Sequence, residues 1–101
     1  MNMRRFWFRF DLPPIGDKQP HSWLNLRLGC GVTGYTEGDC RTIIEAEILG
    51  SDPWPPLIAI TPDIDVSKLD AGHVLPNLEP PNWRGIWFPR GFTKMISSES
   101  T

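Results

Sequence analysis

A strict alternation of side chains near the start of the sequence predicts the first β-strand. Residues 5–10 read Arg-Phe-Trp-Phe-Arg-Phe. In an extended backbone the three phenylalanines share one face, and Arg5, Trp7 and Arg9 share the other. The phenylalanine face must belong to the core, because three rings carry too much apolar surface for a small domain to leave in water. We therefore expect Arg5, Trp7 and Arg9 on the outside of a sheet, as two guanidinium groups beside an indole.

The rest of the chain predicts a small α+β domain. Its 101 residues suit a single domain spanning 1–101, with a frayed tail over about 95–101. Further strands are predicted over 23–28, 29–35, 57–61 and 83–88. The glycines in 29–34 indicate a bulge or the close approach of a neighbouring backbone. The nearly all-apolar run 57–61 predicts a strand buried on both faces.

One helix is predicted, from Glu37 or Gly38 to Leu49. Thr36 is its expected N-cap, and Gly50 is suited to the positive φ that follows a helix. Its apolar stripe consists of Cys40, Ile43, Ile44 and Ile48. We expect this helix to pack on one face of a small antiparallel or mixed sheet of four to five short strands.

Charge is unevenly distributed along the chain. The net charge is −2, but the first ten residues carry only basic groups, and residues 84–94 are basic as well. Between them, residues 37–70 carry eight acids. We expect these segments to fold against each other and partly neutralise each other. The overall acidic balance argues against a nucleic-acid partner, although arginines beside an aromatic ring suit single-stranded ligands.

The two cysteines and the lack of long apolar runs indicate the compartment. Cys30 and Cys40 are too few for a disulfide scaffold, so we expect two free thiols in the core. No run approaches the length of a membrane span, and no secretory signal is recognisable. A cytoplasmic protein without membrane contact is therefore expected.

No pattern in the sequence predicts catalysis, a metal site or a cofactor. His21 and His73 lie in different loops and have no ligand-type residue at metal-binding spacing. Asp63 and Asp65 alternate as in a calcium loop, but the required glycine and terminal glutamate are missing. Asp65 instead suits the N-cap of a short helical turn. Glu47 falls within the apolar arc of the helix, where a carboxylate must reach solvent, pair with arginine or serve a site.

These observations favour a non-enzymatic, tryptophan-rich domain that binds another protein. Tryptophan and arginine are enriched at interface hot spots, and the acidic segment would suit a basic partner such as a toxin or an enzyme. The candidate contact residues are Arg5, Trp7, Arg9, Trp54, Trp87, Glu45, Glu47, Asp63 and Asp65. Two alternatives stay open. One is a small enzyme or ligand-binding protein with a pocket built from Glu47, His73 or the Asp63–Asp65 pair. The other is a homo-oligomeric structural protein, for example a homodimer.

Three segments carry a resemblance: 28–35 (LGCGVTGY), 73–77 (HVLPN) and 84–89 (RGIWFP). Together they resemble small uncharacterised bacterial proteins. The size, the acidic middle and the lack of catalytic motifs are similar to those of immunity proteins, which neutralise a cognate toxin. The resemblance implies a toxin-like partner and brings no catalytic residues.

Overall fold

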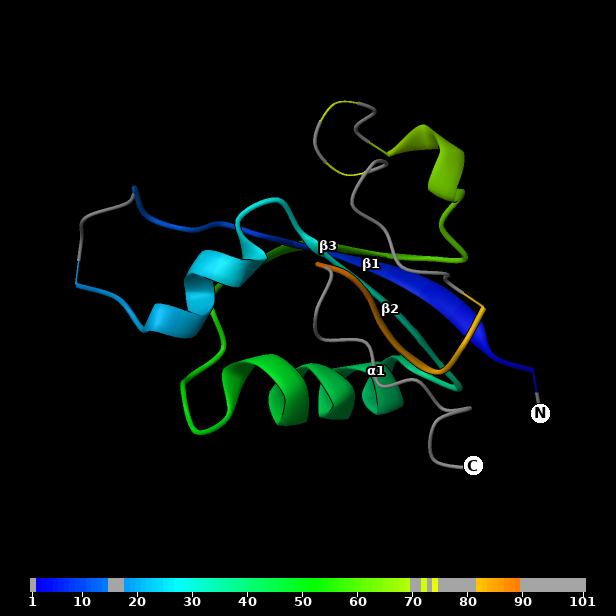
Figure 1. Cartoon of the computed structure of the whole chain (residues 1–101), viewed down its shortest axis with the longest axis horizontal. Helices are drawn as coiled ribbons and strands as arrows, with labels where there is room; N and C mark the ends of the chain where they lie inside the picture. Colours follow the sequence, from blue (N-terminus) through cyan, green and yellow to red (C-terminus); the bar gives the residue numbers. More distant parts are fainter. Residues whose placement is uncertain (1, 15–17, 70–71, 73, 75–81, 90–101) are drawn as a thin grey trace.

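The computed structural model describes residues 2–14, 18–69, 72, 74 and 82–89. The elements are β1 (Arg4–Phe10), η1 (His21–Leu26), β2 (Cys30–Gly34), α1 (Glu37–Ile44), η2 (Glu45–Leu49), β3 (Leu57–Pro62), η3 (Val66–Lys68) and β4 (Gly85–Phe88). The four strands form an antiparallel sheet in the order β3-β1-β2-β4. In Figure 1, α1 lies along one side of this sheet and the helical turn η3 lies on the other. The α+β prediction is confirmed.

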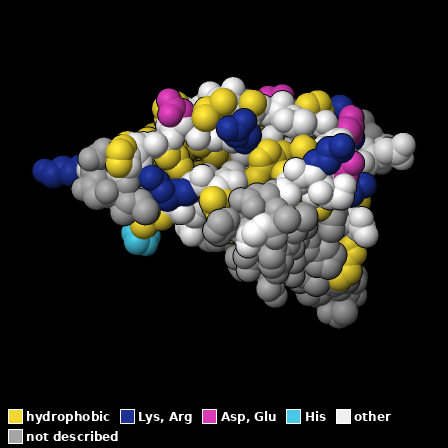
Figure 2. Space-filling model, turned by 90° about the horizontal axis from the view of Figure 1, so that it is seen from above, with side chains coloured by type: hydrophobic (Ala, Val, Ile, Leu, Met, Phe, Trp, Pro, Cys, Tyr) yellow, Lys and Arg dark blue, Asp and Glu magenta, His cyan; other side chains and the backbone are white. Residues whose placement is uncertain are grey.

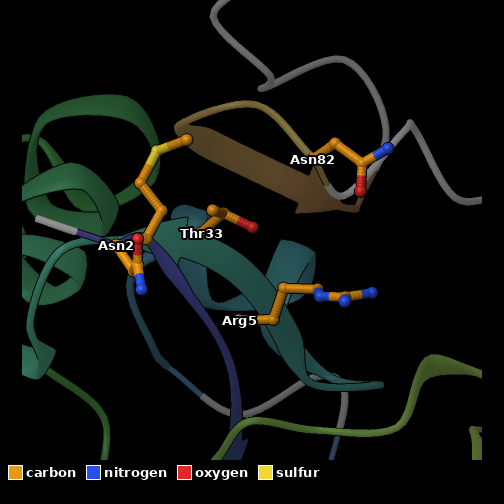
Figure 3. A pocket seen from close by; sticks show the side chains of 5 residues that line it. Asn2, Arg5, Thr33 and Asn82 are labelled. Carbon is orange, nitrogen blue, oxygen red and sulfur yellow. The ribbon is translucent and has the colours of Figure 1, made fainter.

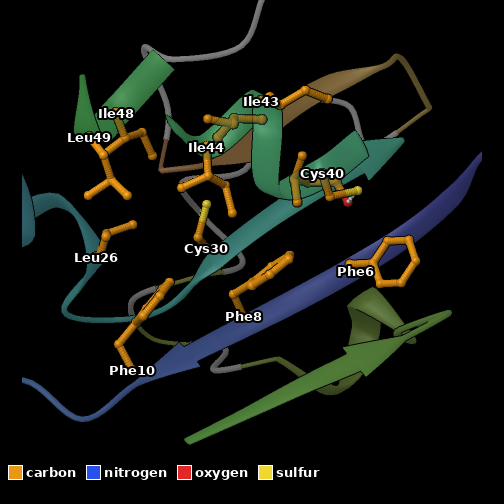
Figure 4. Close-up of a cluster of buried hydrophobic side chains, with 12 residues drawn as sticks. Phe6, Phe8, Phe10, Leu26, Cys30, Cys40, Ile43, Ile44, Ile48 and Leu49 are labelled. Atoms are coloured by element: carbon orange, nitrogen blue, oxygen red, sulfur yellow. Dashed lines mark hydrogen bonds between the residues drawn. The ribbon is translucent and has the colours of Figure 1, made fainter. Parts of the chain in front are cut away.

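The phenylalanine face of β1 packs against the helix, as predicted. Phe6, Phe8 and Phe10 are buried. Figure 4 shows them opposite side chains of α1 and η2. The other buried members of this core are Leu26, Cys30, Val32, Cys40, Ile43, Ile44, Ile48, Leu49 and Ile86. The predicted apolar stripe of the helix is therefore confirmed. The prediction that both cysteines lie in the core is confirmed as well.

The ends of the helix also match the sequence. Thr36 caps it, since its hydroxyl oxygen accepts a hydrogen bond of 3.0 Å from the Asp39 backbone N–H. The last turn widens to a π-helix over Glu45–Leu49, and Gly50 follows with a φ of +60°. A positive φ is unfavourable for residues with a Cβ, which is why glycine stands there.

A second cluster covers the opposite face of the sheet. Its buried members are Trp7, Val74, Trp87 and Phe88, and the partly buried Ile64, Val66 and Leu69 pack against them. These last three come from the chain that follows β3. Both faces of the central strands are therefore covered, and β2 and β4 are buried along their whole length.

Two strand predictions are wrong. Residues 21–26 form the 3₁₀ helix η1 instead of the strand predicted over 23–28. Leu26 is fully buried, whereas Leu24 and Leu28 are exposed. An extended strand would have buried all three leucines on one face. The helical turn is held from both sides of the chain, because the Trp23 N–H donates to Pro20 O and its indole Nε1 donates to Pro53 O.

The other error concerns β3, which is not buried on both faces. Among the described residues it pairs only with β1, so it lies at the edge of the four-stranded sheet. Arg9 pairs with Ala59 and Phe10 pairs with Leu57, so Ile58 is an extra residue in a bulge. Its side chain is 55% exposed. The apolar run of the sequence did not reveal that one strand would end up at the edge.

The glycines around β2 allow a close approach, mainly of side chains, although a Cβ on Gly29 would also lie 3.1 Å from the Phe8 backbone oxygen. A Cβ on Gly31 would lie 2.5 Å from the Trp87 ring. A Cβ on Gly29, whose φ is +107°, would lie 2.4 Å from the Trp7 ring. The predicted bulge is present, because the pairing of β2 with β4 shifts between Gly31 and Val32. Glycine thus lets two indoles lie directly on the sheet backbone.

Candidate functional site

Trp7 and Trp87 are core residues, so the expectation that they form a contact surface is wrong. Trp7 is 6% exposed and Trp87 is 0% exposed. Their ring centroids lie 5.8 Å apart, and Phe88 lies 5.7 Å from Trp7. The chain that follows β3 supplies side chains that pack over them. The Trp87 Nε1 is buried, and no described residue accepts its hydrogen bond.

Arg5 and Arg9 flank Trp7 on this face and remain exposed. Figure 2 shows the molecule from the side of the sheet opposite α1, with basic side chains set among hydrophobic ones. The ion pairs found among the described residues include neither arginine. The predicted basic part of the Arg5–Trp7–Arg9 face is therefore at the surface, although its aromatic part is buried.

Each of these arginines lines a cavity. Arg5 and its cross-strand neighbour Thr33 line a cavity of about 410 Å³ together with Asn2, Met3 and Asn82. Figure 3 shows the polar ends of Arg5, Thr33 and Asn82 around this space. Arg9 lines a smaller cavity of about 220 Å³ with Phe10, Arg27, Leu28 and Gly29. No acidic side chain from the described part of the chain lines either one.

The acidic middle of the chain pairs with the basic ends, as expected. Asp63 accepts two hydrogen bonds from Arg4, at 2.7 and 3.0 Å, and this contact lowers the pKa of its carboxyl. Both side chains are largely exposed, so the pair contributes little to stability. Asp63 also has a φ of +53° and directly follows β3.

A more enclosed ion pair joins Asp39 to Arg84. Arg84 Nε donates to Asp39 Oδ2 at 3.0 Å, and its Nη2 donates to Oδ1. The Tyr35 backbone N–H also donates to Asp39 Oδ2 at 3.0 Å. The Arg84 hydrogen bond is the main cause of a lowered pKa at Asp39. Asp39 thereby links the start of α1 to the residue before β4.

Asp65 caps η3, as the sequence predicted. Its Oδ1 accepts hydrogen bonds from the Ser67 backbone N–H and hydroxyl, which lower the pKa of the carboxyl. Neither Asp63 nor Asp65 lines either of the two cavities. Within the described residues, no three histidines, cysteines or carboxylates gather as a metal site would require.

The remaining predicted contact residues are Trp54, which precedes β3, and Glu45 and Glu47 of η2. Trp54 is half-buried, packs on Phe8 and Phe10, and donates from Nε1 to Glu45 Oε2 at 2.6 Å. Arg41 lies over the Trp54 ring at 5.4 Å. Glu47 is half-buried on η2. His73, which the pocket alternative used, and the tail over 95–101 lie outside the described residues.

The two cysteines are buried and are poorly suited to act as nucleophiles. Cys30 and Cys40 are free thiols in the helix-side core. Burial raises the pKa of both, that of Cys40 to about 12. Thiols in this state are poor nucleophiles at neutral pH.

Sequence reasoning missed Arg27, which lines the smaller cavity beside Arg9. The strand predicted over 23–28 would have continued through Arg27, whereas Arg27 directly follows η1 and the chain turns there. The only feature of the sequence that indicated this turn was Gly29, whose positive φ permits the turn into β2.

No family model matches this chain, and neither does any curated protein or solved structure. In the described part of the chain, none of the helices has the length and apolar character needed to cross a membrane.

Proposed function

We propose that this chain is a non-enzymatic protein-binding domain that pairs an extended segment of its partner with the edge strand β3. The observation that supports this most directly is the outer edge of β3, with which no other described strand pairs. Among the described residues, only β1 pairs with this strand, along its other edge. An unpaired strand edge offers backbone N–H and C=O groups to another chain.

The side chains of β3 favour the same role. Ile58 is the most exposed of the large hydrophobic residues described, at 55%. The bulge sets it apart from the regular pairing with β1, so it is free to enter a pocket on a partner. A partner strand would gain main-chain hydrogen bonds from β3 and specificity from Ile58.

Prolines and charges limit what can bind there. Pro55 and Pro56 precede β3 and Pro62 ends it, which restricts pairing to a short stretch. Natural edge strands use such devices against uncontrolled aggregation. Asp63 and Asp65 follow directly and give the end of this edge an acidic character, although Arg4 offsets Asp63. The immunity-type role, with a basic toxin or enzyme as the partner, belongs to this proposal.

The proposal is tested by placing a photo-crosslinking amino acid at position 58 and, as a control, at exposed Thr42 on α1. We expect one defined adduct at position 58 in the native cell and no such adduct at position 42. The purified partner should then bind Ile58→Lys at least about tenfold more weakly than the wild type, as loss of a hot-spot side chain does. Unfolding in urea should show that the variant remains folded.

Two results would reject the proposal. The first is the same adduct from both positions, which indicates non-specific capture. The second is unchanged affinity of Ile58→Lys for the purified partner. An adduct with a second copy of this chain, together with a dimer in analytical ultracentrifugation, would favour the homo-oligomeric alternative instead.

A further inference from the structure

The smaller cavity brings together two arginines that form no ion pair with a carboxylate of the described residues. Arg9 and Phe10 come from the end of β1, and Arg27, Leu28 and Gly29 come from the turn that leads into β2. Residues far apart in the chain thus line an open cavity of about 220 Å³. Two guanidinium groups in one small space repel each other, so this arrangement has an electrostatic cost.

Three other arginines of the molecule form ion pairs with carboxylates. Arg4 pairs with Asp63, Arg41 pairs with Glu37, and Arg84 pairs with Asp39. None of the ion pairs among the described residues includes Arg9 or Arg27. Asp11 follows Arg9 by two positions. It does not line this cavity, and none of the ion pairs found among the described residues joins it to Arg9. The positive charge of the cavity is therefore uncompensated by the described part of the chain.

The guanidinium of Arg27 is also incompletely hydrogen-bonded. Its Nη2 donates to the Pro13 carbonyl oxygen at 2.8 Å, which fixes the side chain. Its Nη1 is buried, and no described group accepts a hydrogen bond from it. A charge held in place and partly removed from water acts on an anion more strongly than a fully solvated one.

We infer that this cavity binds a carboxylate group attached to a short apolar chain. Arg9 is exposed and has no described partner, so its fork of N–H donors is free to hold a carboxylate through two parallel hydrogen bonds. Arg27 adds a fixed second charge. Phe10 and Leu28 supply apolar wall, and Leu28 is 52% exposed. The volume is smaller than the 300–1,000 Å³ or so of drug-sized ligand sites, so it suits one small group.

Such a carboxylate has two sources, a free short-chain acid or the C-terminus of a peptide ending in an apolar residue. Both are tested with the full-length, ¹⁵N-labelled chain by following the Gly29 amide and the Arg9 Nε–H in NMR titrations. The probes are isovalerate against its neutral amide, and a peptide ending in leucine carboxylate against the same peptide with a C-terminal amide. We expect saturable shifts, with millimolar affinity, for the carboxylate probes only.

Arg5→Gln provides a matched control, because Arg5 lies on the same face of β1, belongs to none of the ion pairs found among the described residues and lines the other cavity. Arg9→Gln should weaken binding by about tenfold or more, whereas Arg5→Gln should leave it unchanged. Arg9→Lys keeps the charge but loses the fork, so it should give an intermediate affinity. Unfolding in urea verifies that each variant is folded.

Saturation by isovalerate would assign the site to a free acid, and saturation by the peptide carboxylate only would assign it to a chain terminus. Either result supports the inference. Equal shifts from acids and amides, shifts that never saturate, or equal losses in Arg5→Gln and Arg9→Gln would each overturn it. None of these outcomes depends on β3, so this site and the proposed function stand or fall separately.

Discussion

Replacing Gly31 by alanine tests how closely the buried indoles lie on the sheet. The added Cβ would sit 2.5–2.6 Å from three carbon atoms of the Trp87 ring. Ordinary contact begins near 3.5 Å, so the ring or the strand must move by about 1 Å. Trp87 is completely buried and packs against Trp7, which leaves it little room to move. The clash therefore has to be absorbed by the core.

The expected loss follows from two opposing effects. Overpacking of a tight core costs about 1–3 kcal/mol. Against this, alanine restricts the unfolded chain and returns about 0.4–1 kcal/mol. We expect Gly31→Ala to lower the free energy of unfolding by about 1–2 kcal/mol. In a domain of this size that corresponds to a fall in melting temperature of about 4–8 °C per kcal/mol.

Gly38→Ala is the matched control. Gly38 lies in α1, and a Cβ there would meet only Thr36 Oγ1, at an unstrained 3.8 Å. The same substitution should therefore stabilise the protein by up to about 1 kcal/mol through helix propensity. Both variants are measured by urea unfolding followed through tryptophan fluorescence. Opposite signs are expected for the two glycines.

A double-mutant cycle tests whether contact with the Trp87 ring causes the loss of stability in Gly31→Ala. Trp87→Leu removes the ring that the new Cβ meets, so Gly31→Ala should cost less in that background, with a coupling of about 1 kcal/mol or more. If Gly31→Ala is as stable as the wild type, or gains stability as Gly38→Ala does, the close packing of Trp87 on β2 is refuted. A loss that is unchanged in the Trp87→Leu background would refute the assignment to that ring.

Three further predictions concern the second cluster, the Asp39–Arg84 pair and the thiols. Trp7→Ala should lower the free energy of unfolding by about 3–5 kcal/mol, measured in urea, because it empties a buried aromatic site; a loss below about 1 kcal/mol would contradict that burial. Asp39→Asn should destabilise the protein at neutral pH. Because the folded pKa of Asp39 lies below the ordinary 3.8, its contribution is present above that value and disappears as the pH falls through the folded pKa. The stability difference from the wild type should therefore narrow below about pH 4, and a difference that does not change with pH would argue against the ion pair. Cys30 and Cys40 should react with a thiol reagent at neutral pH only at the rate of opening or unfolding, so rapid labelling of the native protein would show that they are accessible.

The sequence by itself determined the elements whose signals are local. The alternation in β1 identified the phenylalanine face, and the spacing of apolar residues after Thr36 identified the helix, its cap and its buried stripe. These predictions succeed because one backbone conformation repeats its side-chain directions at a fixed period. The N-cap of η3 at Asp65 was equally local, since a side chain two residues from its backbone donor decides it.

Tertiary structure alone decided what covers each surface. Alternation predicts two faces for β1, but only the return of the chain after β3 buries Trp7 against Ile64, Val66, Leu69 and Val74. The leucines of 23–28 alternate like a strand, yet η1 buries Leu26 because long-range packing and the bond from Trp23 to Pro53 outweigh that pattern. Strand order likewise places the apolar β3 at an edge and Arg27 beside Arg9. These features depend on residues distant in the chain, and local periodicity carries no information about which distant segment will lie alongside.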